Sequence, residues 1–593
     1  MRHQTAGKIQ VLAVMLAAAI GTPSAALAAA AQAQAADLIL FNAKVWTVDD
    51  KRPSAEAVAV RGNRIVKVGS SKEVLALKGS ATRALDMEGK LVLPGFHDSH
   101  THFGNATEFF FTVPLTDVND VTLMAERVKR TAARVPKGLW ITGGDWASGA
   151  ANAANKDRKA GFEPLLPDLK TIDAVSPDHP LIFRRFDHIY FANSAALKLA
   201  RLSPKTPNPA GGSYGKDPVT GELNGLLYGT AGEILERQLP PMSIKQKMIG
   251  ARAVQKDLNK VGITSITDMA RIDDISNEQI YPFYVERSAT DTRIFDALKK
   301  SGELSVRVHA MLPLETEKEL IKHKVKPYSG DEWLRYGALK AYGDSGIMYK
   351  PFTGNGLPSE WSYRFPGESV FAREVIEADK AGYDIGVHII GDKAVNALIN
   401  WYSDAITQNP PRERRMRLIH VWHTTQEDIK RAGKLGFVAD VQPFHLEREV
   451  ALIGDTLDDE RARSTHAWKS MIDAGIVLSL GSDLPGSYNR LHVSPYNPLE
   501  NIFSAVTRTN KKGFPAGGWH PEQKLSVQEA IKGYTFNPAY SSREDRQKGS
   551  ITEGKLADMV VLSKDILTVA PEEYLTTEVV YTILDGKVLD LNK

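Results

Sequence analysis

The chain has 593 residues, of which 42% are hydrophobic and 24% are charged. This composition is that of a globular protein and excludes a disordered, collagen-like or coiled-coil chain. There are 74 Lys and Arg against 71 Asp and Glu, a net charge of +3, so the chain lacks the basic excess of a nucleic-acid-binding protein. It has no cysteine, which excludes disulfides and cysteine-held metals. Any metal must therefore bind His, carboxylates or a modified Lys.

Residues 1–36 are typical of a secretory signal peptide. Two basic residues precede an almost unbroken apolar run at 9–20, and the Ala-rich stretch after it offers cleavage sites at 26–28 and 33–35. The apolar run is shorter than the ~20 residues that a membrane span needs. We therefore predict export to the periplasm with cleavage, and no stable membrane anchor.

Both ends of the mature chain contain short runs that are typical of β-strands. Strand-like runs precede a predicted hairpin at 57–68 near the N-terminus, and similar runs occur at 558–562 and 579–589. We expect residues 37–90 and 541–593 to form one small sheet domain together.

Between these ends, eight apolar strand-like runs alternate with helix-like stretches such as residues 372–381. The alternation favours a parallel sheet, and eight units favour a (β/α)₈ barrel over residues 91–540. The interval 103–250, rich in Gly and Pro, is expected to be an insertion over the barrel mouth after the first strand. The eight runs are 91–93, 263–266, 306–310, 338–340, 385–390, 417–420, 437–441 and 476–480.

A histidine-rich segment follows the first of these runs. Residues 94–102 read Pro-Gly-Phe-His-Asp-Ser-His-Thr-His. Because side chains alternate along a strand, His100 and His102 point the same way and can hold one metal ion. The alternative is a structural histidine pair. The place of the pair at the carboxyl end of a barrel strand, where active sites of this fold lie, favours the metal.

Four other predicted strand ends carry side chains that can bind a metal. His388 and His420 lie in two of the runs, Lys340 lies in a third, and Asp483 follows a fourth. Any one of them could be structural, and a lone histidine at a strand end is more often a core or surface residue than a metal ligand. Four such residues around one barrel mouth favour a metal site.

These motifs together resemble the amidohydrolase superfamily, and within it the amidohydrolase-3 or YtcJ-like group, which includes N-substituted formamide deformylases. The resemblance covers residues 37–593. It implies a metal-dependent hydrolase of C–N bonds on a distorted (β/α)₈ barrel, with a β-sandwich domain composed from both chain ends. The matching segments are 94–103, 187–188, 193–197, Lys340 with Asp344, 388–395, 441–445, 481–485 and 549–558.

By position, the resemblance implies that His100 and His102 bind a first metal, and that His388 and His420 bind a second. The implied cofactor is one or two divalent ions. Zn²⁺ is expected, and Fe, Co or Mn suit the same donors. A metal in this place lowers the pKa of a bound water and polarises the scissile carbonyl.

The remaining implied roles concern the bridge between the metals and the substrate. Lys340, carboxylated by CO₂, is implied to bridge the metals, and Asp483 to be a ligand that also transfers a proton. His445 and His188 are candidate donors to the substrate or its oxyanion, with His445 as a second catalytic residue. Trp146, in the insertion, either lines a substrate pocket or packs in a core.

Three residues complicate this assignment. Ile419 stands where the group usually has Glu, which puts substrate contacts in doubt. His97 stands where the group usually has an apolar residue. Because its side chain points to the opposite face of the strand from that of His100, we interpret it as a packing residue. His423 remains an alternative ligand to His420.

We therefore predict an exported amidohydrolase that cleaves an amide, formamide or cyclic amide bond of a small molecule. Two alternatives stay open. One is ester, lactone or deamination chemistry on the same metal site, and the other is a non-catalytic periplasmic binding or regulatory protein, which Ile419 favours. No nucleic-acid partner is expected, and a homo-oligomer is compatible with the sequence.

Overall fold

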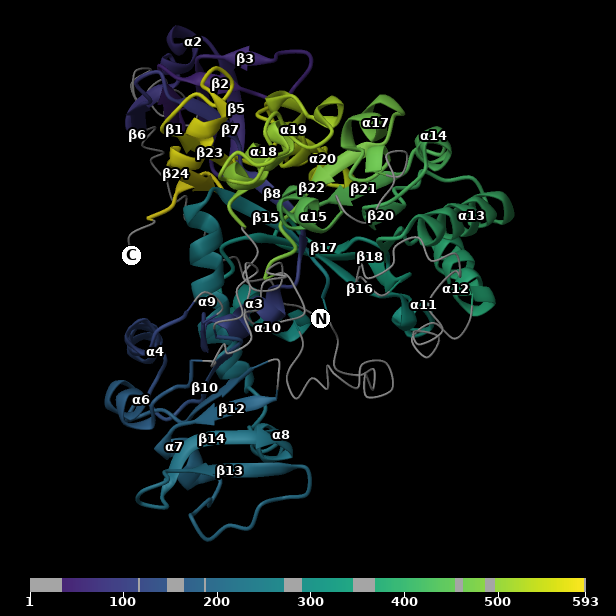
Figure 1. Cartoon of the computed structure of the whole chain (residues 1–593). Coiled ribbons are helices and arrows are strands. Elements are labelled where there is room, and N and C mark those ends of the chain that lie inside the picture. Colours follow the sequence, from purple (N-terminus) through teal and green to yellow (C-terminus); the bar gives the residue numbers. More distant parts are fainter. Residues whose placement is uncertain are drawn as a thin grey trace, which may run out of the picture.

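The computed structural model describes residues 35–115, 118–146, 165–185, 188–270, 291–344, 368–453, 462–485 and 496–590. The predicted signal peptide lies almost wholly outside these ranges. Figure 1 shows two sheets at the top, a barrel of strands and helices, and an insertion at the bottom. Within the described ranges, no helix combines the length and the apolarity that a membrane crossing requires.

The two chain ends meet in one pair of sheets, as predicted. In the first sheet, β4 (Ala57–Arg61) and β5 (Arg64–Gly69) form the expected hairpin. In the second, β7 (Leu91–Pro94) pairs with β23 (Met559–Leu562) from the other end of the chain. Apolar side chains from both ends share one buried core. The other elements are β1 (Ala36–Phe41), β2 (Lys44–Trp46), β3 (Ser54–Ala55), α2 (Ser71–Leu75), β6 (Lys78–Asp86), β24 (Val579–Leu584) and β25 (Lys587–Val588).

The prediction for the first barrel strand was wrong. We expected residues 91–93 to begin the barrel, but they form β7 of the composite sheet, and the barrel begins with β8 (Phe96–Thr101). Gly95 separates the two strands. A Cβ at this position would lie 2.3 Å from Thr264 Oγ1, so glycine permits the close passage from one sheet to the next. An apolar run does not reveal which of two buried sheets it joins.

Eight strands form a nearly closed parallel barrel. All neighbours from β8 to β22 pair in parallel, and Thr101 and Leu484 bridge the gap between β22 and β8. The strands and their covering helices share one large apolar core. The other strands are β15 (Ile263–Asp268), β16 (Arg307–Pro313), β18 (Leu334–Tyr342), β19 (Ile385–Ile389), β20 (Arg417–His420), β21 (Val438–Val441) and β22 (Val477–Leu480), with β17 (Ser329–Gly330) beside β18.

Helices surround the barrel in Figure 1 and follow several of its strands. This alternation is the predicted one. The helices are α10 (Asp291–Ser301), α11 (Glu317–Lys322), α12 (Glu368–Lys380), α13 (Asp392–Gln408), α14 (Gln426–Lys434), α15 (Pro443–Ile453), α17 (Trp468–Asp473), α18 (Pro498–Thr507), α19 (Val527–Gly533) and α20 (Phe536–Ser541).

The insertion between β8 and β15 has a six-stranded sheet and its own apolar core. In Figure 1 it lies on the side of the barrel remote from the composite sheets. Its strands are β9 (Thr112–Val113), β10 (Ile141–Gly144), β11 (Leu181–Arg184), β12 (Ile189–Ala192), β13 (Gly212–Lys216) and β14 (Leu223–Gly229). Its helices are α3 (Phe103–Phe109), α4 (Val121–Arg134), α6 (Leu169–Val175), α7 (Ser194–Leu199), α8 (Thr230–Glu236) and α9 (Ile244–Lys260).

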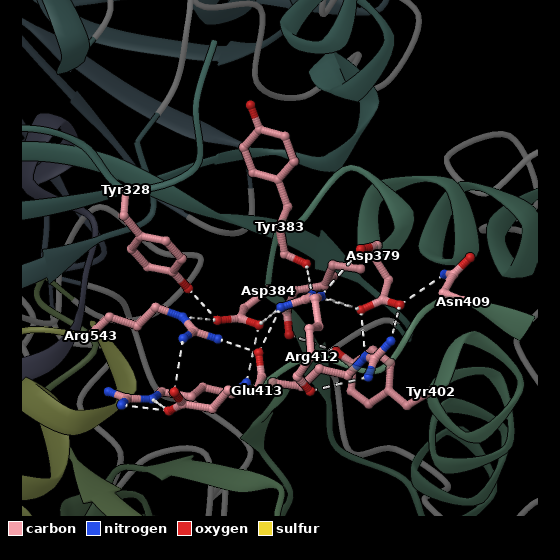
Figure 2. A network of polar contacts seen from close by, with 12 residues as sticks. Tyr328, Asp379, Tyr383, Asp384, Tyr402, Asn409, Arg412, Glu413 and Arg543 are labelled. Atoms are coloured by element: carbon pink, nitrogen blue, oxygen red, sulfur yellow. Dashed lines mark hydrogen bonds and ion pairs between the residues drawn. The ribbon is translucent and has the colours of Figure 1, made fainter. Parts of the chain in front are cut away.

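An ionic network ties the C-terminal segment to the end of the barrel where strands begin (Figure 2). Asp384 directly precedes β19 and is fully buried. It accepts hydrogen bonds from Arg412 Nη1 at 2.9 Å, Arg543 Nε at 2.7 Å and Tyr328 Oη at 2.5 Å. Burial raises the pKa of Asp384, but the hydrogen bond and charge of Arg543 and the charge of Arg412 outweigh it and hold the pKa below its ordinary value. The carboxylate is therefore ionised and fixes Arg543, which follows α20.

Candidate metal centre

The carboxyl ends of five barrel strands bring the predicted ligands together. His420 and Asp483 have positive φ angles of 71° and 56°, which non-glycine residues rarely adopt and which are found preferentially at functional sites. His100 lies in β8 with His102 just after it, Lys340 lies in β18, His388 in β19 and His420 at the end of β20, and Asp483 follows β22.

His100, His102 and Asp483 form the tightest group. Their candidate ligand atoms all lie within 4.8 Å of one another. The Nε2 atoms of His100 and His102 are 3.4 and 3.3 Å from Asp483 Oδ1. His100 is fully buried, and neither of its ring nitrogens has a hydrogen-bond partner. Buried polar atoms are rarely left without a partner, so a cation fits this place.

The charge states of this group also suit a cation. Burial, and then the charges of Lys340 and His420, hold the pKa of His100 well below its usual range, so its imidazole is neutral. Burial raises the pKa of Asp483, but His102, His420 and His445 outweigh it and keep the pKa below its ordinary value. A neutral imidazole and an ionised carboxylate are the forms that bind metals.

His388 and His420 form a second group beside the first. Their ring centroids are 4.4 Å apart, and the His420 ring is 4.9 Å from that of His100. His420 Nδ1 lies 2.6 Å from Gln442 Oε1 and donates to it, which leaves Nε2 for a metal. His388 Nε2 is 3.5 Å from Asp344 Oδ1. The two groups thus offer donors for two neighbouring ions.

Lys340 has the properties that carboxylation requires. Its Nζ is buried without a hydrogen-bond partner and lies 4.7 Å from the centroid of the Tyr342 ring. Burial lowers the pKa of Lys340 to about 7. A substantial fraction of the amine is therefore neutral near pH 7, the form that reacts with CO₂ to give an anionic carbamate.

His445 adjoins Asp483 on the other side. It is part of α15, and its Nε2 is 3.6 Å from Asp483 Oδ2. Its ring centroid lies 5.9 Å from that of His420. His445 therefore faces the same small volume as the candidate ligands.

Two supporting residues escaped the sequence prediction. Asp98 is fully buried and accepts hydrogen bonds from His100 N at 3.1 Å and Ser482 N at 2.9 Å, so it joins the two strands that carry His100 and Asp483. Gln442 fixes the His420 ring. Asp98 stands inside the histidine-rich segment and Gln442 directly follows β21, but a single sequence does not distinguish such polar residues from solvent-facing ones.

The two predicted substrate-binding residues lie in the insertion. The His188 side chain is 60% exposed, and its Nδ1 is 3.6 Å from Glu233 Oε1. Trp146 is fully buried, packs against Phe183 and donates from Nε1 to Leu165 O at 2.5 Å. Within the described ranges, no hydrogen bond or ion pair joins either residue to the candidate ligands. Their roles, and the placing of the insertion over the mouth, stay predictions.

His97 and His423, the two other histidines considered from the sequence, have different neighbours. His97 Nε2 lies 3.0 Å from Thr267 Oγ1 in the barrel interior, which agrees with a packing role. His423 Nδ1 lies 2.8 Å from Thr465 Oγ1. The ring contacts to His100 and His388 come from His420, which favours His420 as the ligand.

Comparison with known proteins adds evidence independent of this geometry. A model described as "Amidohydrolase family" matches residues 83–590. Protein LONG AFTER FAR-RED 3 of Arabidopsis thaliana is 30% identical over 89% of this chain and 87% of its own length. The N-substituted formamide deformylase of Arthrobacter pascens is 27% identical over 93% and 98%. An uncharacterized metal-dependent hydrolase from Pyrococcus horikoshii OT3 aligns over 90% of this chain and 99% of its own, with a TM-score of 0.64 and 20% identity, which shows a shared fold.

Proposed function

Because the chain belongs to the amidohydrolase family, and is thus a hydrolase of C–N bonds, we propose that it uses a divalent metal to hydrolyse a small amide. The observation that carries the proposal is the convergence of His100, His102 and Asp483 within 4.8 Å, with unpartnered imidazole nitrogens on His100. Family membership itself implies a divalent metal.

Two metal positions follow from the two groups of donors. His100, His102 and Asp483 would hold one ion, and His388 and His420 a second, with carboxylated Lys340 between them. Zn²⁺ is our expectation, because imidazole and carboxylate donors suit it. When bound, such a metal would lower the pKa of a water molecule and polarise the substrate carbonyl.

Asp483 is placed to move the proton that this hydrolysis requires. Its Oδ1 faces His100 and His102, and its Oδ2 faces His445. The carboxylate accepts one proton as the water oxygen bonds to the carbonyl carbon. It then donates that proton to the nitrogen as the C–N bond breaks, so that a carboxylic acid and an amine leave.

His445 is placed to orient the substrate. Its Nε2 lies 3.6 Å from Asp483 Oδ2, and its ring is next to His420. An imidazole N–H in this position donates a hydrogen bond to the substrate carbonyl oxygen and stabilises the charge that develops there.

We further propose an amide, formamide or cyclic amide as the substrate class. The support is the similarity, over nearly the full length of both chains, to a protein named N-substituted formamide deformylase. We also propose that the protein is exported to the periplasm and acts on a small molecule without nucleic acid. N-terminal sequencing of the protein from the periplasmic fraction tests export, and an intact residue 1 would overturn it.

Metal analysis of the purified protein tests the proposal. We expect His100→Ala to lose metal at the first position and to lower kcat/KM on formamides by at least about 100-fold. His520→Ala is a matched control, because His520 contacts Glu522 at 3.2 Å and lies outside the candidate ligands. Full activity in metal-free protein or in His100→Ala would refute metal catalysis. Hydrolysis of esters with no turnover of amides would refute the substrate class.

A further inference from the structure

A set of buried side-chain nitrogens without hydrogen-bond partners lies beside the candidate metal centre. Trp422 follows His420 by two residues and is 8% exposed, and its Nε1 has no hydrogen-bond partner. His466 Nε2, Trp468 Nε1 and Arg508 Nη2 are likewise buried and without partners, in side chains that are at most 1% exposed. A folded protein seldom buries so many unsatisfied polar atoms together, so each needs an explanation.

These four side chains form a continuous group that begins at the candidate catalytic residue His445. The Trp422 ring centroid lies 5.1 Å from that of His445 and 5.7 Å from that of His466. The His466 ring lies 5.6 Å from Trp468, whose ring is 4.7 Å from Arg508 Cζ. A backbone hydrogen bond of 2.7 Å from His466 N to Trp422 O fixes the first two residues together.

Arg508 gives the group a positive charge without a close counter-ion. Its Nε and Nη1 donate to the backbone oxygens of Trp519 and His466 at 2.6 and 3.0 Å. Within the described ranges, no carboxylate oxygen lies within 4 Å of its guanidinium. Burial lowers the pKa of Arg508 to about 9, so the side chain is still a cation at neutral pH. A buried cation without an ion-pair partner is unfavourable for the folded state.

We propose that Trp422, His466, Trp468 and Arg508 form an anion-binding subsite that takes a carboxylate of the substrate. An anion supplies both the acceptor atoms that the N–H groups lack and the charge that Arg508 lacks. A neutral amide or a water molecule would supply only the acceptors. The substrate is then an amide that bears a negative group on the part remote from the scissile bond.

We place the entrance to the proposed subsite at the metal centre. The side chains of His102 and Asp483 are 24% and 16% exposed. His445 lies between Asp483 and Trp422. A substrate bound with its carbonyl oxygen at His445 can therefore direct its acidic group toward Trp422 and Arg508. The role as a substrate subsite rests on the proposed function, whereas anion binding itself does not.

Equilibrium binding without turnover tests the subsite. The metal-loaded full chain is titrated with propanesulfonate, a poor metal ligand, and with methyl propyl sulfone, its neutral counterpart. Calorimetry and tryptophan emission report binding. We expect wild type to bind the sulfonate about ten-fold more tightly, as charge-assisted hydrogen bonds predict. Arg508→Met should abolish this preference, and Trp422→Phe should weaken sulfonate binding by about five-fold for one lost hydrogen bond.

Arg130→Met is the control, because the Arg130 side chain is 66% exposed and pairs only with its helix neighbour Glu126 in the described ranges. It should bind as wild type does. If Arg508→Met fails to fold, two other variants still test the proposal. Arg508→Lys should keep the preference for the sulfonate, and Trp422→Phe should reduce the affinity for the sulfonate. Equal binding of both probes to wild type, or an unchanged preference in folded Trp422→Phe and Arg508→Met, would overturn the proposal.

A substrate pair separates this proposal from the proposed function. N-formyl-β-alanine should be hydrolysed with a higher kcat/KM than its neutral amide, and Arg508→Met should remove the difference. Loss of all hydrolysis with a persistent sulfonate preference would refute the enzyme mechanism and leave the anion subsite standing. Hydrolysis without discrimination between acid and amide would refute the subsite alone.

Discussion

Replacing Asp98 by alanine tests how the barrel positions its candidate metal ligands. Asp98 lies at the gap between β22 and β8, which few backbone contacts close. Asp483 N donates to His100 O at 2.8 Å there, and His102 N to Leu484 O at 2.6 Å. The Asp98 carboxylate adds bonds from His100 N, Ser482 N and Ser482 Oγ. It thus holds the strands of His100 and Asp483 in register.

The size of the effect follows from these three bonds. Asp98→Ala leaves the His100 N–H and the Ser482 N–H and O–H buried without an acceptor. Each such group costs about 1–3 kcal/mol, so we expect the free energy of unfolding to fall by about 3–9 kcal/mol. Asp98→Asn keeps the shape and one acceptor oxygen, and should cost about half as much.

Chemical denaturation and Zn²⁺ competition titration measure the two consequences. Because His100 and Asp483 lose their common anchor, Zn²⁺ affinity should fall by about 10–100-fold, as for other residues that support metal ligands. Asp473→Ala is the control, since its side chain is 61% exposed and pairs with Lys469 at the surface. Unfolding free energy and Zn²⁺ affinity equal to those of wild type in Asp98→Ala would refute this reasoning.

Three further predictions concern residues away from the β22–β8 gap. Asp384→Asn should lower the unfolding free energy by about 1–3 kcal/mol at pH 7, because it removes a buried negative charge that accepts hydrogen bonds from Arg412 and Arg543, while Arg412 keeps Asp379 and Arg543 keeps Glu413 as ion-pair partners. The pKa of Asp384 is lowered in the folded state, so this difference should be complete above its unfolded pKa of about 4 and should shrink as the pH falls below it, in urea titrations from pH 7 to pH 3. Gln442→Ala should free the His420 ring and reduce Zn²⁺ affinity by about ten-fold, measured by competition with a chelator. Intact mass spectrometry under mild conditions should show the added mass of one CO₂ on the wild-type chain and not on Lys340→Ala. The same added mass in the variant would exclude Lys340 as its site.

Much of the architecture and of the candidate ligand set could be read from local pattern. Alternation along a strand predicts that His100 and His102 share a face, and the structure places both beside Asp483. The parallel barrel follows from apolar runs spaced by helical segments, and His420 closes one such run while His388 lies near the end of another. These inferences need only neighbours in the chain, which is why one sequence suffices.

What local pattern does not determine is which distant elements meet. The apolar run 91–93 would suit a strand of the composite sheet or of the barrel equally well. Gly95 decides between the two sheets, because it lies in close contact with Thr264, which is 169 positions away in the sequence. The buried roles of Asp98 and Gln442 likewise depend on partners from other strands. The buried charge of Arg508, which has no ion-pair partner in the described ranges, appears only after Trp468 and Trp519 pack over its guanidinium. Burial and pairing are properties of the packed chain, so the sequence names the donor groups, while tertiary structure sets their desolvation, their partners and hence their chemistry.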